Sequence, residues 1–264
     1  MIQLSKGVYF EGSVIDTLGK PITLRGVIDK NDGAPLTLLD GSNQHRVLQC
    51  ISGEANDTLF ENLVIQHGFA AGEVVEEPIH RGGGMRNEGS SPALVNCRFQ
   101  DNEANIAGGM YNDASSPTLH GCTFANNLAN TTDSKGGGMH NEASSPALTD
   151  CTFTSNTAST DGGGMYTTES NGTDLTDCEF MDNSATRHGG GMSNNGSALT
   201  LSNCTFTGNS AATFSGLGGG MHNMDASSLT LNDCTFTANT ARGGGGGVDR
   251  ATRRKVGRAP THHA

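Results

Sequence analysis

The fold is decided by AGGMYNDASSPTLHGCTFANNLA, residues 107–129, because this stretch recurs along the chain. Six copies each keep Gly-Gly-Met, a Leu, Cys-x-Phe, an Asn and an Ala. Their Met and Cys positions alternate along the chain without exception: Met85, Cys97, Met110, Cys122, Met139, Cys151, Met165, Cys178, Met192, Cys204, Met221 and Cys234. A period of about 25 to 30 residues indicates a solenoid, whose units bury their apolar face by stacking on neighbours.

Each unit shows the alternation of short strands. Cys and Phe stand two residues apart with a polar residue between them, so one face points inward and the other outward. Before each Cys stands Asn, Asp or Gly, and these residues tolerate the left-handed backbone of a bend. The inward Leu of each unit is expected to be Leu94, Leu119, Leu148, Leu175, Leu199 and Leu229.

The regular positions predict ladders along a narrow core. Six Phe, six Leu and six Met would each contribute roughly 1.5 to 3 kcal/mol when buried. The Asn residues five after each Cys and two after most Met residues suit stacked amide ladders. A helical solenoid is disfavoured because Gly, Asn, Ser and Thr fill the units. The sequence therefore predicts an all-β, single-stranded right-handed parallel β-helix of about 8 to 10 coils.

We divide the chain into a β-helix, residues 1–248, and an irregular basic tail, residues 249–264. The coils of residues 1–80 are degenerate and those of 81–248 are regular. In the degenerate part, Phe60, Asn62, Leu63 and Ile65 take the Leu, bend, Cys and Phe positions. Residues 71–80 are expected to project as an insertion. The tail abandons every ladder, which favours a truncated or out-of-frame end over an arm that binds an acidic partner.

Charge and hydropathy exclude some classes of function. Residues 1–242 carry 11 Lys and Arg against 26 Asp and Glu, a formal charge of −15, and an acidic body argues against binding nucleic acid. No stretch approaches the roughly 20 apolar residues of a membrane span. The first residues have no secretory signal, and we expect that the natural start is missing because Met1 leads directly into strand-like sequence.

The motifs GGGM(Y/H)N, SSPxL, (N/D)CTFxxN and the upstream LDGSNQHRVLQC…FENLVIQHG resemble those of bacterial right-handed parallel β-helix repeat proteins. More loosely, the repeats are similar to those of polymorphic outer membrane proteins. The resemblance covers residues 20–248. It implies a pectin-lyase-like fold and an extracellular or cell-surface location, and its motifs are specific for fold rather than function.

Enzymes that share this fold provide the alternative function. A polysaccharide lyase would need clustered Asp ligands for calcium beside a catalytic Arg or Lys, and a glycoside hydrolase a group of carboxylates in one cleft. Neither pattern is found, and the basic residues of the repeats are scattered over different coils. No catalytic residue is assigned. No cofactor or metal is predicted either, since zinc-type spacing is absent and the Cys series reads as small buried residues.

One outward line of residues, called the outer column from here on, follows the Met positions: Arg86, Tyr111, His140, Tyr166, Ser193 and His222. Exposed Tyr and His at regular spacing could stack on sugar rings or contact a partner protein. The alternative is that these are unselected solvent-facing positions. The sequence thus favours a non-catalytic structural or adhesive segment that binds glycan or a cell-surface protein, with a carbohydrate-active enzyme as the alternative.

Overall fold

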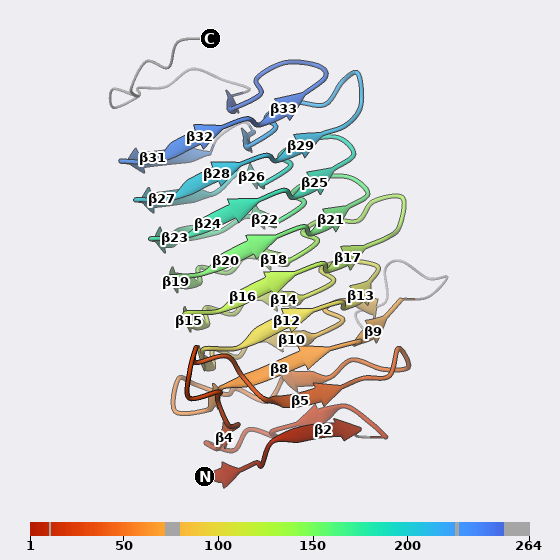
Figure 1. The fold of residues 1–264 in the computed structure, drawn as a ribbon. Helices are drawn as coiled ribbons and strands as arrows, with labels where there is room; N and C mark the ends of the chain where they lie inside the picture. Colours follow the sequence, from red (N-terminus) through yellow and green to blue (C-terminus); the bar gives the residue numbers. More distant parts are fainter. Residues whose placement is uncertain (11, 72–79, 225–226, 251–264) are drawn as a thin grey trace.

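The computed structural model describes residues 1–10, 12–71, 80–224 and 227–250, which form a β-solenoid of nine turns (Figure 1). Strands of successive coils pair in parallel, and the described residues contain no α-helix. The prediction of an all-β parallel β-helix of 8 to 10 coils is confirmed. Four sheets run along the solenoid, and we name each after its most regular inward residue.

The Leu sheet comprises β1 (Ile2–Gln3), β4 (Thr23–Arg25), β7 (Leu59–Glu61), β11 (Ala93–Val95), β15 (Thr118–His120), β19 (Ala147–Thr149), β23 (Asn171–Thr176), β27 (Ala198–Ser202) and β31 (Ser228–Asn232). The Phe sheet comprises β2 (Gly7–Phe10), β5 (Thr37–Asp40), β8 (Leu63–Gln66), β12 (Arg98–Gln100), β16 (Thr123–Ala125), β20 (Thr152–Thr154), β24 (Glu179–Met181), β28 (Thr205–Thr207) and β32 (Thr235–Thr237).

The Met sheet comprises β3 (Ile15–Asp16), β6 (Leu48–Cys50), β10 (Met85–Glu88), β14 (Met110–Asp113), β18 (Met139–Glu142), β22 (Met165–Thr168), β26 (Met192–Asn195), β30 (Met221–Asn223) and β34 (Val248–Arg250). The shorter Ala sheet comprises β9 (Phe69–Ala70), β13 (Glu103–Ala104), β17 (Leu128–Ala129), β21 (Thr157–Ala158), β25 (Ser184–Ala185), β29 (Ser210–Ala211) and β33 (Thr240–Ala241).

The core consists of the predicted ladders. The Phe rings from Phe99 to Phe236 stack almost parallel, with centroids 4.6 to 4.8 Å apart, which matches the spacing of neighbouring strands. The Asn ladder is equally regular: Asn156 donates from Nδ2 to Asn183 Oδ1 at 2.9 Å and to the carbonyl of Phe124 at 2.9 Å. The core is narrow, and the stacking of the same side chains from coil to coil along the solenoid stabilises it.

The predicted bends lie where the sequence placed them. The residue before each of the six repeat cysteines adopts a positive φ of 49° to 63°, from Asn96 through Gly121 to Asp233. The degenerate coil is also confirmed, because Phe60 pairs with Leu94 and Ile65 with Phe99. One assignment is wrong: Leu201 and Leu231, rather than Leu199 and Leu229, continue the ladder of Leu175, because they too stand three residues before the repeat Cys.

All seven cysteines are free thiols. The Cys151 thiol donates to the carbonyl of Leu119 at 3.8 Å, and burial raises the pKa of the Cys122 thiol well above its usual value. These residues therefore pack as neutral, small side chains. Strand β34 extends the solenoid to Arg250. Most of the predicted insertion (72–79) and of the predicted tail (251–264) lies outside the described residues.

Candidate functional site

The outer column is a single line of side chains across the Met sheet. The pairing register joins Arg86 to Tyr111, then to His140, Tyr166, Ser193 and His222. The same line continues through Gln49 and Asp16 at the N-terminal end and through Asp249 at the other. Because these residues alternate with the buried Met and Asn ladders, their side chains leave the strands on the outer face.

The expectation that the outer column is exposed is wrong. Tyr111 is 1% exposed, Tyr166 3% and His140 5%, and Ser193 and His222 are buried as well. The rings pack against one another: His140 lies between Tyr111 and Tyr166, with centroid distances of 5.3 and 4.9 Å. The tyrosine faces are therefore not free to stack on a sugar in this structure. The outer column belongs to a second, smaller core outside the Met sheet.

A second line of chain covers the outer column. It consists of the residues just before the glycines of each repeat, and we call it the cover row: Arg81, Ile106, Lys135, Asp161, His188 and Leu217. Isolated parallel bridges join Lys135, Asp161, His188 and Leu217 from coil to coil. Glycine at a positive φ follows five of these six residues, with +67° at Gly162, and Ala107 takes the same place after Ile106 at +57°. Glycine lets the chain turn back directly onto the strand.

The cover row contacts the outer column with an offset of one coil. The Arg81 guanidinium lies 5.0 Å from the centroid of the Tyr111 ring, and Lys135 Nζ lies 5.2 Å from that of Tyr166. His188 stacks on His222 with ring centroids 4.5 Å apart. In each case the covering residue belongs to one coil and the covered ring to the next. Cation–π contacts and ring stacking thus link neighbouring coils outside the main core.

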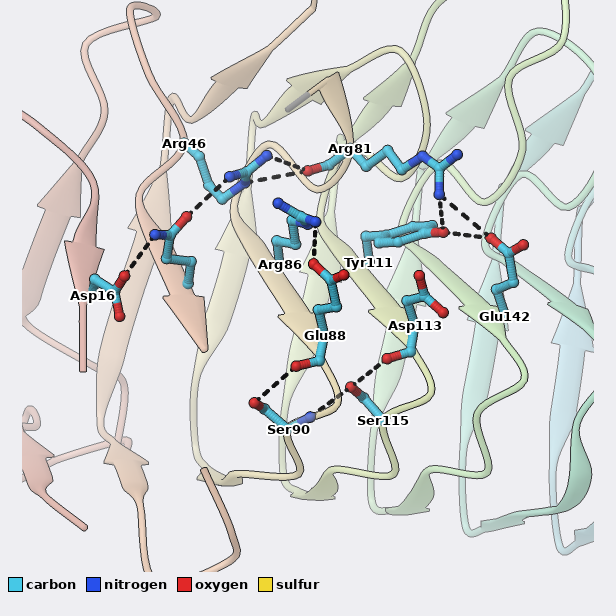
Figure 2. A network of polar contacts seen from close by, with 11 residues as sticks. Asp16, Arg46, Arg81, Arg86, Glu88, Ser90, Tyr111, Asp113, Ser115 and Glu142 are labelled. Atoms are coloured by element: carbon cyan, nitrogen blue, oxygen red, sulfur yellow. Dashed lines mark hydrogen bonds and ion pairs between the residues drawn. The ribbon is translucent and has the colours of Figure 1, made fainter. Parts of the chain in front are cut away.

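Beside the outer column, three carboxylates align on the same face of the Met sheet. Glu88, Asp113 and Glu142 are in register on β10, β14 and β18, and we call them the carboxylate row. Figure 2 shows Asp113 between Glu88 and Glu142, with the arginines on the side of the outer column. Glu88 and Glu142 keep 49% and 43% of their side-chain surface exposed. The carboxylate row is therefore accessible to a ligand, unlike the aromatic rings next to it.

Two arginines and a tyrosine bind Glu88 and Glu142, the first and last members of the carboxylate row. Arg86 pairs with Glu88, and Arg81 Nη1 lies 3.6 Å from Glu142 Oε2 (Figure 2). The Tyr111 hydroxyl accepts a hydrogen bond from Arg81 and donates one to Glu142. Burial raises the pKa of Tyr111 far above its usual value, and the bond to Glu142 adds to this effect. Tyr111 therefore remains a neutral donor that orients Glu142.

Asp113 differs from its two neighbours. Burial raises the pKa of Asp113, and the charges of Glu142 and Glu88 raise it further, while Arg81 and Arg86 oppose them. Three carboxylates on adjacent strands thus divide into two that pair with arginine and one that binds a proton more readily. Such a division of roles is what acid and base chemistry, or binding of a polyhydroxyl ligand by both donors and acceptors, requires.

The network is anchored in the N-terminal coils. Buried Arg46 donates to the carbonyl oxygens of Arg81 and Gly82 at 2.7 and 2.9 Å, so it fixes the first residue of the cover row (Figure 2). Burial lowers the pKa of Arg46 to about 10, so it remains a cation at neutral pH. Gln49 accepts from Arg46 and donates to Asp16 at 2.7 Å. The Arg81 end of the site is therefore rigid.

Other polar residues lie apart from this network. His67 is bound to Asp40 at 2.9 Å on a different side of the solenoid, and His188 belongs to the cover row. Arg98 lies on the Phe sheet. The expectation that the basic residues are scattered is thus wrong for Arg81 and Arg86, which meet at the carboxylate row.

Within the described ranges, no three His, Cys, Asp or Glu side chains are arranged to hold a metal ion. Nor does any described helix have the length and hydrophobicity to cross a membrane. The network in Figure 2 is built from carboxylates, guanidinium groups, amides and hydroxyl groups.

The nine turns, the four sheets with the bends between them, and a polar network on one outer face define a β-solenoid of the parallel β-helix class. Residues 39–236 match the family model described as the right handed beta helix region, and the chain belongs to that family. No curated protein and no solved structure matches the chain.

The carboxylate row and the cover row were both missed in the sequence. The carboxylate row had a readable signal, because Glu88, Asp113 and Glu142 each stand three residues after a repeat Met. In a strand this places them on the same face as the outer column. The cover row had a weaker signal in the residues before Gly-Gly, since local sequence does not tell over which coil those side chains lie.

Proposed function

We propose that the chain is a non-catalytic structural segment of an extracellular or cell-surface protein that binds glycans along the carboxylate row. The observation that carries this proposal is the in-register alignment of Glu88, Asp113 and Glu142 on adjacent strands. Neighbouring strands lie about 4.8 Å apart, so the row offers evenly spaced hydrogen-bond acceptors to a chain of hydroxyl groups. The cell-surface location is supported by the resemblance of the repeats to secreted β-helix proteins.

The charge of the row selects among glycans. Three carboxylates on an acidic body repel polyuronides and sulfated glycans, whereas neutral and amino sugars donate hydrogen bonds to them. Arg81 and Arg86 are already paired with Glu142 and Glu88, so they orient these carboxylates rather than attract anions. The expected ligand is therefore a neutral or amino-sugar polysaccharide.

To test this, the purified chain is titrated with neutral, amino-sugar and uronic acid oligosaccharides, and the heat of binding is measured by calorimetry. The triple variant Glu88→Gln, Asp113→Asn, Glu142→Gln should weaken binding of the neutral or amino sugar at least 10-fold. Glu179→Gln, which changes a partly buried carboxylate on the outer face of the Phe sheet, is the matched control and should bind as the parent does. Equal binding by the parent and the triple variant would overturn the proposal.

A second candidate function is favoured by Asp113 in particular. A carboxyl whose pKa is raised, flanked on both sides by carboxylates, is the arrangement with which glycoside hydrolases combine an acid with a base or nucleophile. Adjacent strands place these groups about 5 Å apart, close to the separation in retaining enzymes. In that case Asp113 would protonate the leaving oxygen.

This candidate is distinguished by products rather than by binding. The chain is incubated with neutral, amino-sugar and uronic polysaccharides, with and without calcium, and reducing or unsaturated ends are measured. New reducing ends that disappear in Asp113→Asn would support hydrolysis, and unsaturated ends would indicate a lyase. Binding without either product would leave the structural role as the function.

A further inference from the structure

His140 occupies a position that suits a neutral imidazole and not a charged one. It is 5% exposed, and neither ring nitrogen makes a hydrogen bond to the described residues. Arg81 and Lys135 face it from the cover row, Tyr111 and Tyr166 from the neighbouring strands, and Glu142 stands two residues along its own strand. Glu142 already accepts the hydrogen bond of Tyr111. A proton on His140 would thus meet two cations, and the Lys135 backbone favours that proton less than burial and the two cations oppose it.

The segment of the cover row in the same coil is bonded to both neighbouring coils but follows an exposed loop. Lys135 accepts a hydrogen bond from the Ala107 amide at 3.1 Å, and the Gly136 amide donates to the Asp161 carbonyl at 3.0 Å. Residues 130–133 precede it as a partly exposed loop, and Lys135 pairs with the exposed Asp133 at 3.8 Å. Local opening of loops with exposed backbone costs far less than global unfolding.

We propose that the cover row at this coil is an acid-released latch, in which protonation of His140 opens the segment around Lys135 and Gly136 and exposes the His140 and Tyr166 rings at the Glu142 end of the carboxylate row. The opening itself does not depend on glycan binding. Only the use of the exposed rings rests on the proposed function, since tyrosine faces next to hydrogen-bond acceptors form the kind of platform on which sugars stack.

The direction of the pH effect follows from the two states of His140. In the closed state, burial together with the charges of Lys135 and Arg81 lowers the pKa of His140 to about 3. In the open state the ring is exposed and its pKa returns to about 6.5. The closed state is therefore fully favoured above about pH 6.5 and loses stability as the pH falls toward 3. Between pH 7 and 4.5 the opening equilibrium should rise on the order of 100-fold.

Hydrogen exchange measured without any glycan tests the latch. After correction for the intrinsic chemical rates, protection of the Gly136 to Met139 amides should fall on the order of 100-fold from pH 7 to 4.5. Amides of β16, the Phe-sheet strand of the preceding coil, should keep their protection. Because no ligand is present, the outcome is independent of whether the carboxylate row binds glycans.

Two matched variants locate the response. His140→Phe keeps a ring between the tyrosines but cannot take up a proton, so its protection should not change with pH; His140→Gln serves the same purpose if the larger ring prevents folding. His120→Phe changes a histidine whose side chain is 61% exposed, and the fall in protection should persist there. Equal protection at both pH values in the parent, or a persisting fall in both His140 variants, would overturn the latch.

Discussion

The outer faces of the Met sheet and the Phe sheet have the same geometry but different surroundings. On the Phe sheet, outward residues such as Thr152 and Thr205 remain partly exposed. On the Met sheet, Tyr111 and Tyr166 point outward in the same way and are buried beneath the cover row. The difference shows that strand alternation determines the direction of a side chain, whereas its exposure depends on the chain that follows or precedes the strand.

The largest effect is expected from removing the glycine that allows this cover. Gly163→Ala places a Cβ 2.4 Å from the carbonyl oxygens of Gly190 and Ser184, so the free energy of unfolding should fall by about 4 kcal/mol. Gly196→Ala, at a φ of +62°, has nothing within 4 Å of the new Cβ and should cost about 1 kcal/mol. Urea unfolding followed by circular dichroism measures both; equal losses would mean that close packing of the cover row does not matter.

The covered ring itself should come next. Tyr166→Ala removes a buried ring that contacts His140 and Lys135, and the free energy of unfolding should fall by about 3 kcal/mol, as for large-to-small changes in a main core. The same urea experiment measures it. A loss below about 1 kcal/mol would show that the outer column behaves as an ordinary surface despite its burial.

A smaller effect is expected from the cations of the cover row. Arg81→Met keeps the length of the side chain but removes the charge over Tyr111 and its pairing with Glu142, and should cost about 1 kcal/mol. Arg242→Met removes a similar contact, 4.5 Å from the ring of Phe214, which is 82% exposed, and should cost less than about 0.5 kcal/mol. Equal losses of unfolding free energy in the two variants would show that partial burial does not strengthen the contact between Arg81 and Tyr111.

The smallest effect is expected on the open face. Thr152→Ala on β20 removes an outward, partly exposed side chain and should change the free energy of unfolding by less than about 0.5 kcal/mol. Together, Tyr166→Ala and Thr152→Ala compare the loss of unfolding free energy on the covered outer face with that on the open one. A loss from Thr152→Ala as large as that from Tyr166→Ala would remove the distinction between the covered and the open sheet.

The ladders could be predicted because each is a local rule repeated at a fixed period. Cys-x-Phe determines the inward face, the Asn or Asp before Cys permits the bend, and stacking follows from the repeat. The burial of Tyr111 could not be predicted in this way, because it depends on Arg81, thirty residues earlier in sequence but one coil away in space. The positions of the carboxylate row could be predicted from the repeat pattern. Its pairing with Arg81 and Arg86 could not, because that pairing depends on the fold.

The one-coil offset between the cover row and the outer column also limits how such a chain can be rearranged. Lys135 covers Tyr166 of the following coil, and Tyr111 donates to Glu142 of the following coil. A coil can therefore be followed only by a coil whose outward residues match its own. Exchanging or deleting whole coils would preserve the inner ladders while mismatching the outer layer, so the order of coils in this chain is itself encoded outside its core.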